Sequence, residues 1–359
     1  MSKISEKNPL GLLAVDHLEF TANELTGHIA EEFSNMGFKR TEENPKEGTT
    51  VYSQGQIRFL LTHHPDSHSH SRKYLETHGE GVSKMSFLVE DCEHAIKEAQ
   101  RRGAKIAADL KVEENTNGVF KTAMIRGFGD VLNEFVERPK NQFRPGYTQI
   151  DNDPSFKALN TRLSRIDHFT NNVPFGEMEK WVQFYKDIYG FVETRYFDIK
   201  GSKTGLNSKV VQLEDNSIII PINQPKEAGA KDQIQEFVER HNGPGVQHIA
   251  LMTPDEIDTV SELRSRGFKF LNIPHTYYEE IPNRPFKVQE DIKTLEDNQL
   301  LVDGDENGYL LQIFTDTYIG PLFYEIIQRK NHWGFGEGNF HALFEAIERD
   351  QVKRGYLKE

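Results

Sequence analysis

The feature that most constrains the fold is an internal repeat that relates the two halves of the chain. Each copy opens with an Asp-His pair, continues into an amphipathic helix pattern that ends at Gly-Phe, and closes on an apolar run around a glutamate. A repeat on this scale predicts two copies of one structural unit. The matched segments are DH at 16–17 and 167–168, GVSK at 81–84 and GVQH at 245–248, and LNEFVER at 132–138 and FYEIIQR at 323–329.

Hydrophobic periodicity gives the same order of elements twice in each half: a strand, a helix and then further strands. Strands that alternate with single helices predict an α+β fold. We expect strands at 12–20, 51–52, 56–61, 82–90, 119–125, 131–137, 209–213, 217–223, 245–252 and 309–315, and helices over 25–36, 92–102, 181–188 and 257–263. The segment 271–298 has no clear period, and we expect it at the surface or the mouth of a site.

The strand expected at 245–252 carries a histidine, His248, on the same face as Ala250 and Met252. A lone strand histidine is usually structural. The repeat adds His168 and Glu325, each of which also lies in a short apolar run. Two histidines and one carboxylate suit a facial iron site, which leaves three coordination positions open. The sequence therefore predicts a metal centre at these three residues.

The first half departs from this pattern at one ligand position. It keeps His17 and Glu134, but Lys84 stands where the second histidine of the other half stands. A protonated lysine carries three donors and no lone pair, so it does not bind a metal ion. We therefore expect one metal site, in the second half, with the first half kept as scaffold.

The segment 138–164 separates the two copies and is rich in Pro, Gly and Asn, which favours a linker. We place the domain boundary there, with an N-terminal domain at 1–150 and a catalytic C-terminal domain at 151–359. After the last repeat, GFGEGN at 334–339 leads to Asn339, which can cap a helix whose apolar stripe is Phe340, Leu343, Phe344 and Ile347. This helix is either a lid over the metal site or an ordinary docked terminal helix.

Two further polar features have plain interpretations. The histidine-rich segment 62–70 intersperses Ser, Asp and Pro with histidines, so we expect an exposed polar loop, even with His78 nearby as a further ligand candidate. Gln312 lies between apolar neighbours in its strand, so it is either held in a hydrogen-bond network or faces a ligand.

Composition excludes several classes of function. The formal charge of −13 over 359 residues argues against a nucleic-acid partner. The single cysteine, Cys92, rules out a disulfide within the chain and fits a reducing compartment. The polar N-terminus and the lack of an apolar run of about 18 residues predict a soluble cytoplasmic protein without a membrane segment.

Beyond these arguments, the chain resembles the 4-hydroxyphenylpyruvate dioxygenase family along nearly its whole length. Together the matching segments are highly specific, although each one alone is weak. They are IDHFTNNV at 166–173, PIN at 221–223, QIQE at 233–236, GVQHIA at 245–250, LLQIF at 310–314, EIIQR at 325–329 and GFGEGNF at 334–340. The resemblance implies the vicinal-oxygen-chelate fold, in which paired βαβββ modules form half-open barrels, with a C-terminal helix over the active site.

The resemblance also implies an activity and its components. A member of this family uses iron(II), Fe(2+), to convert 4-hydroxyphenylpyruvate and O2 to homogentisate and CO2, by decarboxylation, ring hydroxylation and side-chain migration. This reaction belongs to tyrosine and phenylalanine catabolism. Family members tend to be homodimers or homotetramers.

The family's functional residues carry over onto matching positions of this sequence. Its metal ligands correspond to His168, His248 and Glu325, the same three residues that the repeat indicates. Gln247 is at odds with strand parity, because it neighbours His248 and should point the other way on a regular strand. The implied substrate-binding residues are Ser208, Asn223, Gln233, Gln247, Gln312, Phe314 and Phe340, of which Asn223, Gln233 and Gln312 have the implied catalytic role.

Three alternatives remain open at this point. A 4-hydroxymandelate synthase resembles this family and uses the same substrate and metal, although Pro221, Asn223 and Phe340 follow the dioxygenase pattern. An extradiol ring-cleaving dioxygenase shares the fold and ligand types but lacks the long C-terminal helix. A non-catalytic protein that binds an aromatic ligand on the same scaffold is the alternative from another class. The asymmetry between the two halves argues against it, because a pure scaffold has no need of one intact triad.

Overall fold

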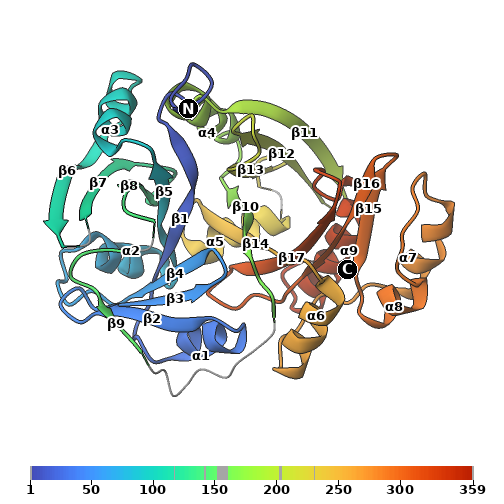
Figure 1. Cartoon of the computed structure of the whole chain (residues 1–359). Coiled ribbons are helices and arrows are strands. Elements are labelled where there is room, and N and C mark those ends of the chain that lie inside the picture. Colours follow the sequence, from blue (N-terminus) through green and yellow to red (C-terminus); the bar gives the residue numbers. More distant parts are fainter. Residues whose placement is uncertain are drawn as a thin grey trace.

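Two β-sheets, one from each half of the chain, lie side by side in this computed structural model (Figure 1). The first runs from blue to green in the figure, and the second from yellow-green to red. The structure describes residues 2–116, 118–140, 143–151, 161–201, 204–229 and 231–357, without the side chains of 341–343, 345, 346 and 350.

The first sheet has nine strands in the order β6-β7-β8-β5-β1-β4-β3-β2-β9. Two βαβββ modules meet at its centre, where β1 pairs with β5 antiparallel and with β4 parallel. The first module consists of β1 (Leu12–Thr21), α1 (His28–Asn35), β2 (Lys39–Asn44), β3 (Thr49–Gln54) and β4 (Ile57–Thr62). The second consists of β5 (Gly81–Val89), α3 (Cys92–Arg101), β6 (Ile106–Asn115), β7 (Gly118–Arg126) and β8 (Leu132–Glu137), with α2 (His70–His78) before it and β9 (Thr148–Gln149) after it.

The second sheet has eight strands in the order β11-β12-β13-β10-β14-β17-β16-β15. Its first module consists of β10 (Arg165–Asn172), α4 (Met178–Phe184) with the π-helical turn η1 (Tyr185–Tyr189), β11 (Val192–Lys200), β12 (Gly205–Gln212) and β13 (Ile219–Pro225). Its second consists of β14 (Gly245–Met252), α6 (Glu256–Ser265), β15 (Leu301–Asp305), β16 (Gly308–Phe314) and β17 (Phe323–Lys330). The additional elements are α5 (Gln233–His241), α7 (His275–Glu279), η2 (Ile281–Asn283), α8 (Ile292–Asp297), η3 (Glu337–Asn339) and α9 (Phe340–Lys353).

The two sheets are topological copies of each other. In both, the first strand of the repeat pairs parallel with the fourth and antiparallel with the strand that opens the next module. The expected α+β class and the paired βαβββ modules are therefore confirmed. The exact domain boundary at 150/151 stays a prediction, and most of the expected linker, 152–160, lies outside the described residues.

Several local expectations differ from the structure. Strands β6 and β11 were not expected, because their exposed faces carry mostly polar residues and show no clean apolar alternation. The segment 271–298 contains α7, η2 and α8, which lie at the outer edge of the second half (Figure 1).

The histidine-rich segment is only partly a loop. Residues 65–68 are exposed, but α2 begins at His70, where the Ser69 hydroxyl accepts the backbone N–H of Arg72. His78, at the end of that helix, is buried and contacts Asp130 at 2.9 Å. Within the described part of the chain, no metal-binding cluster includes these histidines.

One continuous hydrophobic core joins the two halves. Tyr189 of η1 packs edge-on against Phe87 of β5 at 5.6 Å, and its hydroxyl accepts the amide of Asn133 at 2.5 Å. Phe87 also meets Phe169 of β10 at 6.4 Å. The left-handed conformation of Gly190, with φ 73°, ends this helix and returns the chain to the sheet. The helical segment η1 of the second half is thus buried against the first sheet.

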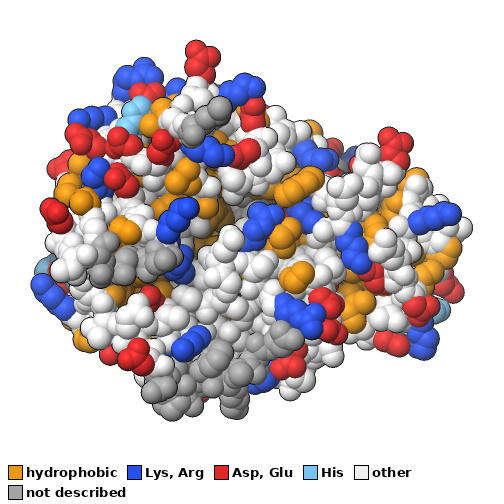
Figure 2. Space-filling view, viewed as in Figure 1, with side chains coloured by type: hydrophobic (Ala, Val, Ile, Leu, Met, Phe, Trp, Pro, Cys, Tyr) orange, Lys and Arg blue, Asp and Glu red, His pale blue; other side chains and the backbone are white. Residues whose placement is uncertain are grey.

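The surface carries charged side chains of both signs. Figure 2 shows Lys and Arg interspersed with Asp and Glu on one face, with hydrophobic side chains in small separate groups. Among the described helices, none is long and apolar enough to cross a membrane.

Candidate metal centre and substrate pocket

The three predicted metal ligands come from three adjacent strands of the second sheet. His168 lies on β10, His248 on β14 and Glu325 on β17. Ala250 of the central strand pairs with His168 on one side and with Glu325 on the other. Because side chains on one face of a strand recur every second residue, His248 lies on the same face as Ala250. The small Ala250 side chain leaves room for the ligands on either side.

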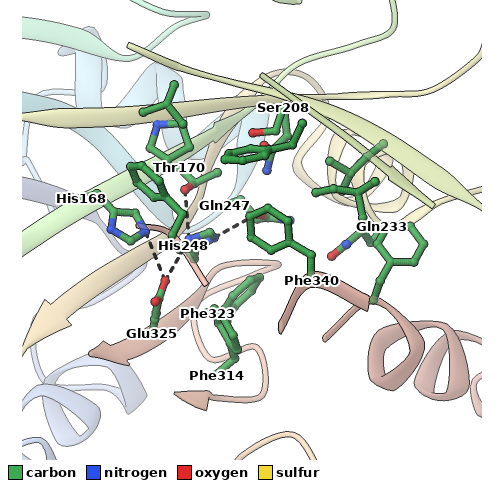
Figure 3. A pocket seen from close by; sticks show the side chains of 18 residues that line it. His168, Thr170, Ser208, Gln233, Gln247, His248, Phe314, Phe323, Glu325 and Phe340 are labelled. Atoms are coloured by element: carbon green, nitrogen blue, oxygen red, sulfur yellow. Dashed lines mark hydrogen bonds and ion pairs between the residues drawn. The ribbon is translucent and has the colours of Figure 1, made fainter. Parts of the chain in front are cut away.

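The ligand atoms converge on one point (Figure 3). Nε2 of His168 lies 3.2 Å and Nε2 of His248 lies 3.5 Å from the same oxygen of Glu325. The group fits within 4.8 Å, and both His168 and Glu325 are buried. Donors bound at right angles to one ion at about 2.1 Å are about 3 Å apart. The spacing and the donor set therefore fit a divalent transition-metal ion.

Each histidine ligand is oriented through its second ring nitrogen. Nδ1 of His168 lies 3.0 Å from the Asp167 carboxylate, and Nδ1 of His248 lies 3.0 Å from the amide oxygen of Gln247. Arg329 donates to both oxygens of Asp167, at 2.8 and 2.7 Å. Acceptors at Nδ1 keep the proton there, so that the lone pair of Nε2 can bind a metal, an arrangement typical of metal-binding histidines. Nε2 of His248 also lies 3.0 Å from the Thr170 hydroxyl.

Two β-bulges put these orienting residues beside the ligands. In the pairing of β10 with β14, Asp167 has no partner between Ile166 and His168, and Gln247 has none between Val246 and His248. A bulge inserts an extra residue, so neighbouring side chains can point to the same side. This explains why Gln247 lines the cavity together with His248, against the parity of a regular strand.

Burial and the opposed charges set the protonation of the ligands. Burial disfavours the charged imidazolium of His168, but the carboxylates of Glu325 and Asp167 outweigh it and raise its pKa to about 9. For His248 burial prevails and lowers the pKa. Burial alone would raise the pKa of Glu325, yet the two histidines hold it below its ordinary value. Without a metal ion the centre therefore retains a proton, which a bound cation displaces.

A largely apolar cavity, partly open to solvent, adjoins the triad. Six of the seven predicted substrate-binding residues line it. They are Ser208, Asn223, Gln233, Gln247, Phe314 and Phe340. In Figure 3, Gln233 lies at the end of the cavity away from His168 and Glu325. The cavity thus has a metal end, an aromatic middle and a far polar end.

Gln312, the seventh predicted residue, is not among the residues that line the cavity. It is buried, and its amide oxygen has no hydrogen-bond partner within the described residues. A Cβ added to Gly336 would lie only 1.9 Å from that oxygen. Gln312 therefore lies beneath the turn that leads to the C-terminal helix.

Aromatic residues that sequence reasoning missed also form the site. Phe323 stacks on His248 at 4.9 Å, and Phe335 meets the His168 ring edge-on at 5.5 Å. Parity provided a signal for Phe323, which lies two residues before Glu325 on the same face of β17. No comparable signal existed for Phe335, because it lies in an irregular turn.

The C-terminal helix α9 covers the cavity with Phe340 and Phe344. Phe340 also contacts Phe197 of β11 edge-on at 5.0 Å. At its other end the helix is held by Gln351, which donates to the Glu236 carboxylate at 2.8 Å. The expected position over the metal site is thus present, while the Leu343 side chain lies outside the described residues.

The corresponding position in the first half is filled by protein cations. Lys84 pairs in register with Glu19, and its ammonium lies 2.7 Å from the Glu19 carboxylate and 4.0 Å from Glu134. Arg144 contacts Glu134 at 2.5 Å. Although burial opposes its charge, the two glutamates raise the pKa of Lys84, so the ammonium stays protonated. The cations thus neutralise the carboxylates at the position where the second half has its candidate metal ligands.

Comparison with known proteins supports the same assignment. Residues 6–152 match the family model described as hydroxyphenylpyruvate dioxygenase, N-terminal, and residues 165–280 match the glyoxalase/bleomycin resistance protein/dioxygenase superfamily. The chain is 42% identical to protein MelA of Shewanella colwelliana, over 98% of this chain and 99% of that protein. It is 38% identical to 4-hydroxyphenylpyruvate dioxygenase of Legionella pneumophila (strain Corby), over 99% of each chain.

A solved structure has the same fold throughout. A triple mutant of 4-hydroxymandelate synthase from Streptomyces coelicolor matches with a TM-score of 0.83 and 25% identity. The match covers 95% of this chain and 99% of the synthase. The vicinal-oxygen-chelate architecture of both halves is therefore confirmed.

Proposed function

The chain belongs to the 4-hydroxyphenylpyruvate dioxygenase family, and on that premise we propose that it is an iron(II)-dependent dioxygenase of tyrosine and phenylalanine catabolism. It converts 4-hydroxyphenylpyruvate and O2 to homogentisate and CO2, with ring hydroxylation and migration of the side chain. The observation that carries this proposal is the His-His-Glu triad at the end of an aromatic cavity closed by α9.

Iron(II) is the proposed metal because two imidazoles and one carboxylate are its typical facial ligand set. When bound, it would supply the redox chemistry that activates dioxygen. His168, His248 and Glu325 would hold it on one side and leave the side facing the cavity open to substrate. The Glu325 carboxylate offsets one of the two positive charges of the ion.

The cavity residues support a single orientation of the substrate. The keto acid would lie at the metal end, where the triad opens into the cavity. The ring would lie between Phe314 and Phe340, and the phenol hydroxyl would reach the polar far end near Gln233. Ser208 and Asn223, paired in register on β12 and β13, supply further hydrogen-bonding groups. The proposed contact of Gln312 with the substrate stays a prediction.

Closure of the cavity serves the chemistry by excluding water. Phe340 and Phe344 of α9 cover it on one side, and Phe335 covers the His168 ring. An apolar cover limits the access of water to the reacting groups and strengthens each hydrogen bond to the substrate.

Product identity tests this function directly. Purified protein is loaded with iron(II) without oxygen, given 4-hydroxyphenylpyruvate and exposed to air, and the products are separated by mass-resolved chromatography. Homogentisate supports the proposal. Hydroxymandelate would keep the metal centre but overturn the proposed ring orientation, and iron binding with no oxygen uptake would favour a binding protein.

A pair of histidine variants tests the metal ligands. His248→Ala should lose both iron and turnover, because a carboxylate and one imidazole hold the ion weakly. His17→Ala is the matched control, since His17 also has an Asp partner, at 2.8 Å, in the half where Lys84 replaces the second ligand histidine. The control should retain one iron per chain. Full activity in His248→Ala would refute the assignment.

We further propose a homodimer or homotetramer, as the family resemblance implies. Light scattering coupled to size exclusion measures the molar mass directly. A monomer at micromolar concentration would contradict this proposal without affecting the assigned reaction.

A further inference from the structure

A second cluster of metal-ligating side chains lies at the base of the C-terminal helix. Asp303 on β15, His332 after β17 and Glu337 in η3 each present one ligand atom, and these atoms lie within 4.8 Å of one another. The three residues are distinct from those that line the substrate cavity. The cluster is therefore separate from the catalytic triad.

The histidine of this cluster presents a buried nitrogen that lacks a partner. His332 is 9% exposed, and its Nε2 has no hydrogen-bond partner among the described residues. This nitrogen lies over Gly334, because a Cβ added to Gly334 would lie 2.3 Å from Nε2 and 2.8 Å from Oε2 of Glu337. Nε2 and a carboxylate oxygen thus flank the same position. An unsatisfied buried imidazole nitrogen is costly and indicates a missing ligand.

The surrounding groups orient these side chains for a metal ion. Nδ1 of His332 lies 3.5 Å from the Asp305 carboxylate, a charge contact that is longer than a typical hydrogen bond. Asp303 accepts the backbone N–H of Gly338 at 3.0 Å, and Glu337 accepts that of Phe335 at 3.0 Å. Both carboxylates are therefore held in place before any ion binds.

The nearby arginines leave negative charge at the cluster. Arg195 contacts Oε1 of Glu337 at 2.5 Å, which leaves Oε2 on the side of His332. Arg329 is neutralised by Asp167 and donates only to backbone carbonyls of this turn. The cluster has two carboxylates but only one arginine contact, so net negative charge remains, and this charge favours a divalent cation.

We propose that Asp303, His332 and Glu337 form a second divalent-metal site, suited to a borderline ion such as Zn²⁺, at the base of α9. Imidazole nitrogens and carboxylate oxygens are both zinc ligands, and three protein ligands with an open fourth position are typical of non-structural zinc sites. The ion would join β15, which carries Asp303, to the segment 332–337 between β17 and α9, which carries His332 and Glu337. The site would therefore fix the base of the helix that covers the substrate cavity.

Zinc stoichiometry tests the proposal, since the two sites are removed by different substitutions. Metal-free protein is equilibrated with Zn²⁺ and dialysed, and bound zinc is measured by elemental mass spectrometry. We expect two zinc ions per chain in the unchanged protein, one in His332→Ala, one in His248→Ala and none in the double variant. This readout is independent of turnover, so a failed dioxygenase assignment leaves it interpretable.

Matched variants separate a built site from surface binding. His275→Ala removes an exposed histidine that also faces two carboxylates, at 2.5 and 3.5 Å, and should leave the zinc count unchanged. Glu337→Gln keeps the size of the side chain and should weaken the second site at least 10-fold, so it decides the question if His332→Ala does not fold. A zinc count that both His332→Ala and Glu337→Gln leave unchanged would overturn the proposal.

Discussion

Asp167 joins the metal centre to the turn before the C-terminal helix. It accepts from His168 and Arg329, and Arg329 also donates to the carbonyl of Gly334 at 2.7 Å. The first half contains the same unit, in which Asp16 lies 2.8 Å from His17 and 2.7 Å from Arg138. Burial opposes the charge of Asp16, yet His17 and Arg138 lower its pKa to about 2. Because the unit persists in the first half, where Lys84 replaces the second ligand histidine, it stabilises the fold in both halves.

Asp167→Asn and Asp16→Asn should therefore separate the two roles of this aspartate. Each substitution breaks a buried ion pair, so each should lower the free energy of unfolding by about 3 kcal/mol. Only Asp167→Asn should also weaken iron binding, by about 10–100-fold, because it loosens a ligand histidine. Chemical denaturation and iron titration measure the two effects. Equal iron affinities in the two variants would contradict the orienting role of Asp167.

Metal affinity should rise with pH because binding displaces a proton from the centre. The pKa of His168 is about 9 in the metal-free state, so this histidine is mostly protonated at pH 7. Apparent affinity should then increase nearly tenfold per pH unit from pH 7 to pH 8 and level off above pH 9. Zinc titrations at several pH values measure this apparent affinity. The His332→Ala variant is used because it lacks the proposed second site, so that the titration reports the catalytic centre alone. A flat profile between pH 7 and pH 9 would refute the prediction.

At the scale of elements, regular segments were predictable and irregular ones were not. The triad was predictable because His168, His248 and Glu325 lie in short apolar strands of a repeat, where register and parity limit their positions. The orientation of Gln247 was not, because it depends on a bulge that only strand pairing reveals. Phe335 and the position of Gln312 depend on the turn before α9, which has no periodicity.

That turn makes Gly336 a critical position for the helix over the cavity. Its φ of 74° is left-handed, and a Cβ would lie 1.9 Å from the buried amide of Gln312. At Gly267, φ is 88° and an added Cβ would have nothing within 4 Å. Substitution of Gly267 by Ala therefore measures only the cost of the left-handed backbone conformation. We expect Gly267→Ala to cost about 1 kcal/mol of stability and Gly336→Ala about 2–4 kcal/mol.

Turnover distinguishes the two glycine variants further. Gly336→Ala should displace α9 and raise KM at least several-fold, since Phe340 and Phe344 line the cavity. Gly267 follows α6 and lies away from the cavity, so the Gly267→Ala variant should retain the KM of the unchanged protein. Steady-state oxygen uptake gives both values. Unchanged KM in Gly336→Ala would mean that the turn tolerates the added methyl group without moving the helix.

At the scale of the whole molecule, polar contacts accompany the core that joins the halves. His241, at the end of α5, is buried and lies 2.8 Å from the hydroxyl of Tyr74 in the first half. Its ring stacks on that of His78 at 4.6 Å. Burial, with a smaller contribution from His78, lowers the pKa of His241 to about 4. The junction between the halves therefore contains a neutral imidazole that resists protonation.

Because the pKa of His241 is lowered, we expect acid to reduce the free energy of unfolding through this residue at the junction of the two halves. The unfolded chain protonates His241 near pH 6.5, whereas the folded chain does so only near pH 4, so stability is complete above pH 6.5 and falls between these values. The loss at this residue is up to about 3 kcal/mol. The His241→Asn variant should lose less stability between pH 7 and pH 4.5 than the unchanged protein. The His275→Ala variant, which changes an exposed histidine, should lose as much as the unchanged protein. Denaturant unfolding at pH 7 and pH 4.5 measures both, and an equally steep fall in His241→Asn would assign the acid sensitivity to other groups.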